Sequence, residues 1–276
     1  MNYQESLLRH LGTYKRSVLN IAEPGLYRHK GRDLLKEHIL PLSDRSMNLL
    51  ELARGLAAAH LEQRPHLKLH KHFHHLNSSQ AFAFNLFLPF FGGDSDASRA
   101  LLRALGLPGE LATWELEAVP NSEEGTNFDA KWTDSAGATV FCEVKLSEQD
   151  FGTARGDQPH LDKLKSIYEP GLRGHVDPQS LAEDAFFGQY QILRNVWHCA
   201  AAPGSTLVFL LPRANTRLWP ILARSLESVR PDTRNRIKAV AIEDVLERLE
   251  SQPDGPEELR VYASQLRAKY VPPEAL

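Results

Sequence analysis

The sequence has little cysteine, no long apolar run and no excess of basic charge. Only two of its 276 residues are cysteine, Cys142 and Cys199, and both lie in apolar segments. We therefore expect buried thiols in a reducing compartment and no disulfide framework. No segment approaches the roughly 20 consecutive apolar residues that span a bilayer, and residues 1–16 lack the apolar stretch of an export signal. These absences predict a soluble, cytoplasmic protein.

The balance of charge and the missing motifs exclude several functional classes. Lysine and arginine number 32 against 35 aspartates and glutamates, giving a formal net charge of −3, so any surface for nucleic acid must be local. The glycine-rich stretches at 92–93 and 152–156 match neither a phosphate loop nor a dinucleotide fingerprint. No G-x-S-x-G elbow, CxxC pair or HExxH sequence occurs, which argues against serine hydrolases and zinc proteases.

Residues 127–146 have the pattern of a β-hairpin. Two strand-like runs, 127–132 and 138–146, flank an Asp-Ser-Ala-Gly sequence typical of a turn. A turn centred on this sequence places Asp129 opposite Cys142 or Glu143 on the second strand. The hairpin therefore predicts an acidic side chain from each strand at the same level.

Acidic and basic side chains share one face of the second strand. Because side chains alternate along a strand, Glu143 and Lys145 point the same way. Two neighbouring carboxylates, Asp129 and Glu143, repel each other unless a cation separates them, and oxygen ligands suit a hard ion such as Mg²⁺. A lysine beside that ion could orient a water nucleophile or stabilise charge on a phosphate.

Apolar periodicity predicts the remaining elements. Further strands are expected at 114–119, 205–211 and 238–242. Helices are expected at 2–22, 43–62, 77–91, 96–105, 161–168, 180–201, 215–229, 243–250 and 256–270, the last of them on the surface. In the long helix, Ser180 is the expected N-cap and Glu183 occupies the capping-box position. This order of elements predicts an α/β fold with a mixed central sheet flanked by helices.

No internal repeat, low-complexity tract or clear linker divides the chain. A chain of this length can bury a sizeable core as one α/β domain. We expect a single domain over 1–276, with a helical N-terminal extension over 1–76, a core over 77–250 and a C-terminal helix over 251–276.

The hairpin and the elements around it resemble the PD-(D/E)XK, or restriction-endonuclease-like, nuclease core. The matching residues are Asp129 and Glu143-Val144-Lys145, and the resemblance covers roughly residues 80–242. One departure is Phe128, which stands where the pattern has proline.

The resemblance implies Mg²⁺-dependent hydrolysis of phosphodiester bonds, with Mn²⁺ as a substitute ion. Asp129, Glu143 and the carbonyl of Val144 would be metal ligands. Lys145 would position the attacking water. A nuclease acting on DNA, such as a prokaryotic restriction or defence endonuclease, is the expected function, and double-strand cutters of this kind often act as homodimers.

The sequence that follows the hairpin resembles a helix that lines the DNA groove in several branches of the superfamily. Gln189, Tyr190 and Arg194 are the candidate nucleic-acid-binding residues, and the last two are neighbours on one helix face. They could hold a phosphate or stack on a base. Alternatively, Arg194 pairs with Glu183 or Asp184 and has no role in binding.

Many nucleases of this class take a further acid from the helix before the first strand, but the 77–91 segment contains none. The replacement could be Gln80 or Asn85, or the ligand could be absent. It could also come from one of four acids near the first strand: Glu115, Glu117, Glu123 and Glu124. One-metal chemistry is therefore the default expectation.

A histidine-rich segment precedes that helix. Its imidazoles belong to His66, His70, His72, His74 and His75. Imidazole is a common zinc ligand, but the spacing fits no closed zinc site and no cysteine is near. We expect a basic, partly exposed connector that could face phosphates.

Two other functions stay open. A protein with this fold can lose catalysis and only bind nucleic acid or a partner protein. A small-molecule hydrolase could use the same acids. In the plainest structural interpretation, the Glu-x-Lys strand is a solvated face and Asp129 is a surface acid near a turn.

Overall fold

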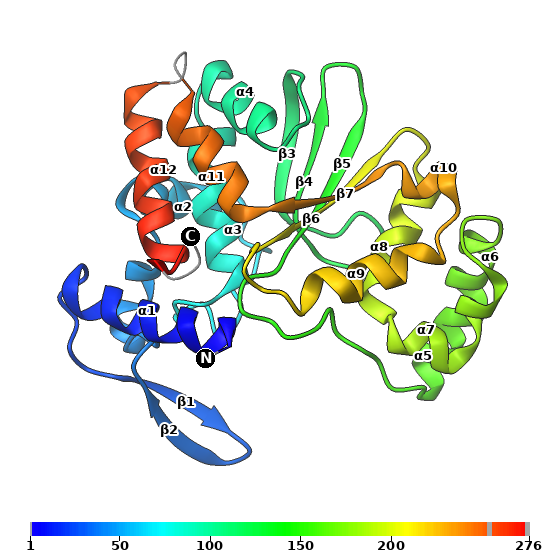
Figure 1. Cartoon of the computed structure of the whole chain (residues 1–276), viewed down its shortest axis with the longest axis horizontal. Helices are drawn as coiled ribbons and strands as arrows, with labels where there is room; N and C mark the ends of the chain where they lie inside the picture. Colours follow the sequence, from blue (N-terminus) through cyan, green and yellow to red (C-terminus); the bar gives the residue numbers. More distant parts are fainter. Residues whose placement is uncertain (1, 253–255, 274–276) are drawn as a thin grey trace. The chain divides into compact units, whose positions relative to one another are not determined.

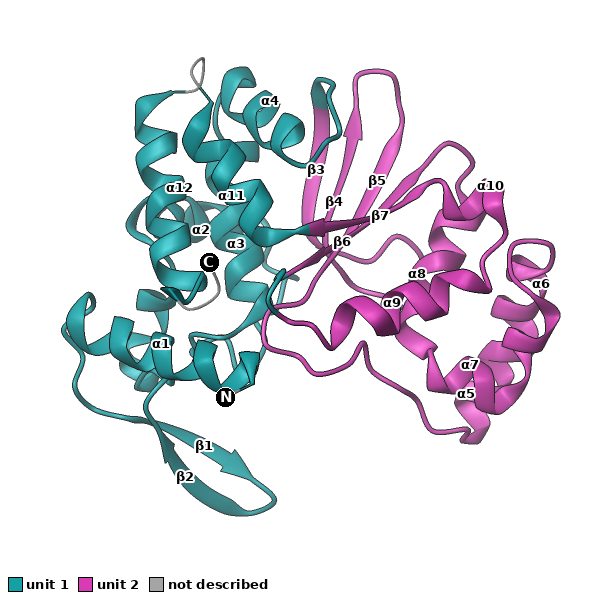
Figure 2. Cartoon of the chain, viewed as in Figure 1, with its two compact units in different colours: residues 1–111, 212–214, 241–276 teal, residues 112–211, 215–240 magenta. Residues whose placement is uncertain are grey.

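The structure is a computed structural model that describes residues 2–252 and 256–273. The chain forms two compact units, coloured in Figure 2. The first comprises residues 1–111, 212–214 and 241–276, and the second comprises 112–211 and 215–240. These boundaries differ from the segments expected at 76 and 250. The assignment of a single domain stays a prediction.

The first unit is mainly helical (Figure 1). Its helices are α1 (Tyr3–Ser17), the 3₁₀ helix η1 (Leu42–Asn48), α2 (Glu51–Gln63), α3 (Ser79–Phe91), α4 (Ser95–Ala104), α11 (Ile242–Ser251) and α12 (Glu257–Tyr270). A two-stranded antiparallel sheet joins β1 (Gly25–His29) to β2 (Arg32–Lys36). Helix α3 packs against α2, α4 and α12. All its residues from Gln80 onward are buried, because its sequence is apolar on every face.

Two expectations in this unit are wrong in detail. The predicted 43–62 helix is split into η1 and α2, because the extended residue Leu50 donates its N–H to Oδ1 of Asn85 over 2.8 Å instead of to a helical carbonyl. The C-terminal helix is not a simple surface helix. It buries Tyr262, Leu266 and Tyr270.

The second unit is built on a five-stranded sheet in the order β3-β4-β5-β6-β7. The strands are β3 (Leu111–Ala118), β4 (Phe128–Asp134), β5 (Thr139–Val144), β6 (Thr206–Leu211) and β7 (Ile237–Ala241). Strand β5 pairs antiparallel with β4 and parallel with β6. This mixed sheet with flanking helices confirms the predicted α/β, restriction-endonuclease-like fold.

Helices cover one face of this sheet with aromatic and aliphatic side chains. The helices of this unit are α5 (Gln158–Lys163), the π-helix η2 (Leu164–Tyr168), α6 (Glu169–Leu172), the 3₁₀ helix η3 (Pro178–Leu181), α7 (Glu183–Gly188), α8 (Tyr190–Ala201), α9 (Leu218–Glu227) and α10 (Pro231–Arg234), and α8 contacts β6. Phe128, Phe141 and Phe209 of the sheet join Leu193 and Val196 of α8 in one buried cluster. This cluster fixes α8 against the hairpin.

The predicted 180–201 helix is not continuous. Ser180 lies in η3 and caps no helix, because α7 begins at Glu183 with Ala182 as its N-cap. A second break falls at Gln189. In a continuous helix, the carbonyl of Phe187 would accept from the N–H of Gln191. Instead Phe187 accepts from the N–H of Ala154 over 3.1 Å, and Gln191 donates to the carbonyl of Gly152. A loop that is distant in sequence therefore separates α7 from α8.

Both cysteines are buried and free, as expected. Within residues 2–252 and 256–273, no helix has the length and apolar character needed to cross a membrane.

Candidate active site

The hairpin of β4 and β5 brings the predicted acids together. The observed register pairs Ala130 with Cys142, and one further step along the strands places Asp129 across from Glu143. The turn forms as its sequence suggests. Gly137 has φ 84°, a left-handed conformation that suits glycine, and its N–H donates to the carbonyl of Asp134.

Asp129 is tied to the second strand by a backbone hydrogen bond. The N–H of Val144 donates to its Oδ2 over 2.8 Å. Because Val144 lies between Glu143 and Lys145, this bond holds the first acid beside the Glu-x-Lys sequence. The role of the Val144 carbonyl as a ligand stays a prediction.

Glu143, Lys145 and Gln191 form a closed triangle of polar contacts. Lys145 Nζ lies 2.9 Å from Glu143 Oε1 and donates to Gln191 Oε1 over 2.9 Å. Gln191 Nε2 donates to the same Glu143 oxygen over 2.6 Å. Both Glu143 and Lys145 are buried. Strand β5 is thereby joined to α8 through the side chain of Gln191.

The electrostatics of this cluster are those of crowded acids with one nearby cation. Burial raises the pKa of Asp129 well above its usual value, and the negative charges of Glu143 and Glu117 raise it further. Burial alone would lower the pKa of Lys145, but attraction to Glu143 and Glu148 outweighs it and raises the pKa to about 12. Lys145 is therefore an ammonium ion at neutral pH, whereas Asp129 resists ionisation.

Glu117 is the acid of β3 that contributes to this field. Its backbone has φ 51°, a left-handed conformation that is unusual for a non-glycine residue in a strand. Its Oε2 accepts from Nδ2 of Asn127 over 2.6 Å. Strained residues of this kind cluster at functional sites. Of the four acids considered as extra ligands, Glu117 is the one whose negative charge raises the pKa of Asp129.

The donor set fits a divalent ion that keeps water or substrate in its coordination shell. In the described part of the chain, no three His, Cys, Asp or Glu side chains gather in metal-binding geometry. Mg²⁺ typically uses only one or two protein carboxylates and fills its octahedron with water and phosphate oxygens. Asp129 and Glu143 suit this pattern, since a cation between them would relieve the repulsion that raises the pKa of Asp129.

The chain matches one protein family over most of its length. A family described as restriction endonucleases associating with ARP matches residues 8–271. The chain belongs to this family. No curated protein matches the chain, and no solved structure does. The match confirms the restriction-endonuclease-like resemblance that the hairpin sequence indicated.

In this member of the restriction-endonuclease family, Arg194 pairs with Glu124 and not with Glu183 or Asp184. Its Nε lies 2.8 Å from Oε1 of the fully buried Glu124 carboxylate. The guanidinium also lies 4.9 Å from the ring centre of Tyr190. Arg194 is thus positioned by α8 and by the loop after β3.

Glu124 is the centre of a second polar cluster. It accepts hydrogen bonds from four other side-chain or backbone donors, which come from Thr126 (N and Oγ1), Tyr168 and His198. Burial favours the protonated acid, but the hydrogen bonds from His198 and Tyr168 outweigh it and hold the pKa of Glu124 well below its usual value. A buried carboxylate with these partners is structural, and it keeps Arg194 in place.

Other predicted residues lie in different surroundings. Gln189 occupies the N-cap position of α8 without a side-chain capping bond, and its Nε2 donates to the carbonyl of Ala185. The side chains of Gln80 and Asn85, considered as replacements for the missing acid, are engaged within the first unit. Gln80 accepts from the N–H of His70, while Asn85 bonds to Leu50 and to other residues of that unit.

The histidine segment carries less charge than its composition suggests. His74 and His75 are buried. Burial lowers the pKa of His74, and burial together with the neighbouring imidazoles lowers that of His75 to about 3. These rings are neutral at pH 7. The two rings contact each other edge to face, and His75 also contacts Tyr27 edge to face. This part of the segment is therefore packed and is not a basic connector.

Sequence reasoning missed Gln191 as a member of the site. It lies in the same helix as the candidates Gln189, Tyr190 and Arg194, but the break before α8 sets which face meets β5. No feature of the sequence alone distinguishes Gln191 from Gln189.

Proposed function

We propose that the protein is a Mg²⁺-dependent nuclease that hydrolyses phosphodiester bonds of DNA. The observation that supports this most strongly is the contact of Lys145 with Glu143 and Gln191, beside Asp129. A buried lysine held between a carboxylate and an amide, next to a second acid whose pKa is strongly raised, is the kind of cluster found at functional sites.

Asp129 and Glu143 would hold the ion. When bound, Mg²⁺ polarises the scissile phosphate and lowers the pKa of a coordinated water. Lys145, whose pKa is about 12, keeps its proton at pH 7. It therefore orients the nucleophile and stabilises charge on the phosphate, and it does not act as a general base. Gln191 would hold the side chains of Glu143 and Lys145 in position through its two hydrogen bonds.

We also propose that Gln189, Tyr190 and Arg194 support the substrate on α8. Tyr190 and Arg194 line a pocket beside the acid cluster, which consists of Asp129, Glu143 and Glu117. Their contribution would add a salt-dependent component to DNA binding through Arg194.

The test is cleavage of plasmid and single-stranded DNA by the purified chain with Mg²⁺ or Mn²⁺. Glu143→Gln and Lys145→Ala should each abolish cleavage. Lys131→Ala, a change on the same hairpin, should cleave like the wild type. Melting temperatures would show that every variant is folded. Unchanged cleavage by Glu143→Gln or Lys145→Ala would remove that residue from the mechanism.

The description of the family also names an association with ARP. We propose that this chain takes part in such an association. Co-expression with the ARP encoded by the same source, followed by size-exclusion chromatography, would test it. Separate elution at micromolar concentrations would contradict it.

A further inference from the structure

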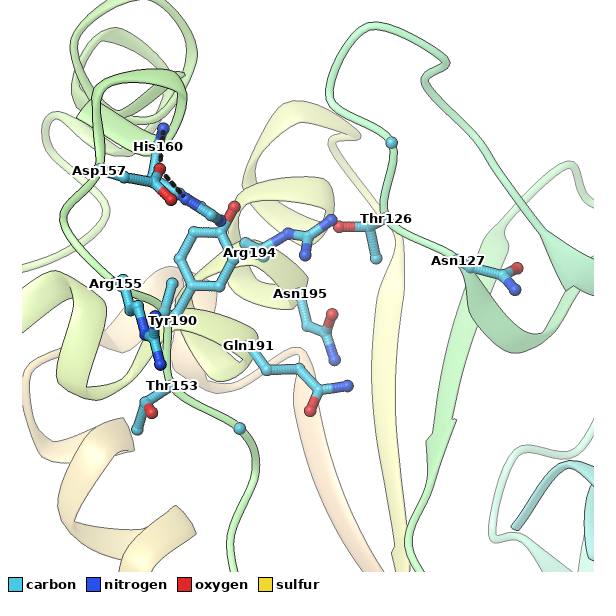
Figure 3. Close-up of a pocket in the computed structure, with 13 residues that line it drawn as sticks. Thr126, Asn127, Thr153, Arg155, Asp157, His160, Tyr190, Gln191, Arg194 and Asn195 are labelled. Carbon is cyan, nitrogen blue, oxygen red and sulfur yellow. Dashed lines mark hydrogen bonds and ion pairs between the residues drawn. The ribbon is translucent and has the colours of Figure 1, made fainter. Parts of the chain in front are cut away.

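A pocket of about 570 Å³ opens beside the acid cluster, within the second unit (Figure 3). Helix α8 forms one wall. The loop that includes Thr153 and Arg155 and the segment that includes Thr126 and Asn127 contribute the rest. This volume lies in the range of small-molecule and nucleotide sites.

Two of the lining side chains connect the pocket directly to the acids. Gln191 bonds to Glu143 and Lys145, and Asn127 bonds to Glu117. A group bound in the pocket would therefore lie one side chain away from the proposed site of hydrolysis.

Asn195 is the unusual residue of this pocket. It is fully buried, and neither its Nδ2 nor its Oδ1 has a hydrogen-bond partner among the described residues. It follows Gln191 by one helical turn, and Figure 3 shows its amide directed toward the space between α8 and the segment of Thr126 and Asn127. Buried amides without partners are rare, so each one calls for an explanation.

We propose that the pocket receives an unstacked nucleobase of the DNA substrate, and that the amide of Asn195 hydrogen-bonds to the edge of that base. This inference rests on the proposed function and names the part of the substrate that binds next to the cleaved bond.

The chemistry of the amide selects a base over a phosphate. Asn195 presents a donor and an acceptor side by side, and each nucleobase has an edge with a complementary pair. A phosphate offers only acceptors, so it would leave Oδ1 without a partner. The exposed cation of Arg155 lies at the same pocket and suits the backbone phosphate of the bound nucleotide.

The aromatic content of the wall fits the same ligand. The rings of Tyr190 and His160 lie with centres 5.3 Å apart in an edge-to-face arrangement, and both residues line the pocket. Bases bind to proteins by stacking on aromatic and guanidinium planes. The pocket thus combines aromatic rings with polar side chains, among which Asn195 is the buried amide available to read a base edge.

The test uses oligonucleotides that carry 2-aminopurine at each position in turn, as single strands and as duplexes, in buffer with EDTA so that no cleavage occurs. The fluorescence of this base rises when it leaves the stack. We expect a rise at one position with the wild-type protein. With Asn195→Leu, the rise should disappear and binding should weaken about 10-fold, the loss expected for one two-bond contact to a base.

Melting temperatures keep the test independent of folding. Because Asn195→Leu replaces an unpartnered amide with an apolar side chain of similar size, its melting temperature should equal or exceed that of the wild type. Asn195→Asp retains the shape and an acceptor but loses the donor, and it should also lose the signal. Asn235→Ala, a change at an exposed asparagine of the same unit, is the control.

The outcomes separate the two proposals. If the fluorescence rise depends on Asn195 but the protein cleaves no DNA with Mg²⁺, the proposed base-binding pocket is supported and the proposed nuclease activity is refuted. If the wild type cleaves DNA but fluorescence rises at no position, or rises equally with Asn195→Leu, the proposed base-binding role of the pocket is refuted and the proposed nuclease activity stands. Marked destabilisation by Asn195→Leu would also count against the pocket, since it would show that the amide has a structural partner.

Discussion

Gln191 Nε2 donates to Glu143 Oε1 over 2.6 Å, although 48 residues separate them in the chain. The other amide atom of the same glutamine accepts from Lys145. One side chain therefore sets the orientation of both proposed catalytic groups of β5.

Replacing Gln191 should lower activity more than stability. Gln191→Ala removes the contacts that orient Glu143 and Lys145, and groups in such supporting positions typically contribute 10–100-fold to metal affinity or activity. We expect a loss of about that size in cleavage rate at saturating DNA. Gln179→Ala, an exposed glutamine of the same unit, is the matched control. Equal rates for the two variants would show that Gln191 is dispensable.

Removal of Glu124 should destabilise the second unit. Its carboxylate is buried and holds Arg194, Tyr168 and His198, so Glu124→Ala leaves the partly buried cation of Arg194 and two buried donors without their partner. Losses of about 3–5 kcal/mol are typical for this kind of change. Urea denaturation of Glu124→Ala and of the exposed neighbour variant Glu123→Ala measures the difference. A loss for Glu124→Ala no larger than for Glu123→Ala would contradict the structural role.

Asp129→Asn should stabilise the protein without metal. The pKa of Asp129 is raised by burial and by neighbouring acids, so the folded state binds this proton more tightly than the unfolded state does. The stability that comes from the proton is present at low pH and is lost as pH rises through the folded pKa. In EDTA at pH 8, Asp129→Asn should therefore melt higher than the wild type, and the difference should shrink on acidification. Mg²⁺ should raise the melting temperature of the wild type only.

The folding stability of the first unit should decrease in mild acid. Burial lowers the pKa of His38 to about 4, of His60 to about 4 and of His75 to about 3, against 6.5 in an unfolded chain. The unfolded state therefore binds more protons in this range. Stability is complete above pH 6.5 and falls as pH decreases toward 4. Hydrogen exchange of peptides from residues 38–78 should accelerate over this interval, and His75→Phe should reduce the effect. Exchange that does not change with pH, after correction for intrinsic rates, would contradict it.

The hairpin could be predicted from the sequence because its information is local. Alternating side chains and a turn with Asp134 and Gly137 set the register, and the register alone brings Asp129 to the level of Glu143. The buried strand β6 and the buried cysteines follow from apolar runs in the same way.

The rest of the site depends on contacts between distant segments. The apolar pattern continues through Gln189, so the sequence indicates one long helix, whereas the backbone of Gly152 and Ala154 interrupts it. This interruption decides that Gln191 contacts Glu143 and Lys145, and that Gln191 and Asn195 join Tyr190 and Arg194 in lining the pocket. The pairing of Arg194 with Glu124, 70 residues apart, is likewise absent from any local pattern.

The docking of Gly152 and Ala154 at the junction of α7 and α8 has a consequence for how related chains can vary in length. One residue inserted or deleted between β5 and this junction would shift which carbonyls and amides meet there, and α8 would begin at a different residue. We therefore expect insertions among relatives to be confined to other connections, such as the tip between β4 and β5. A transplant of the β4–β5 hairpin into another scaffold should fail unless the loop and α8 are moved with it.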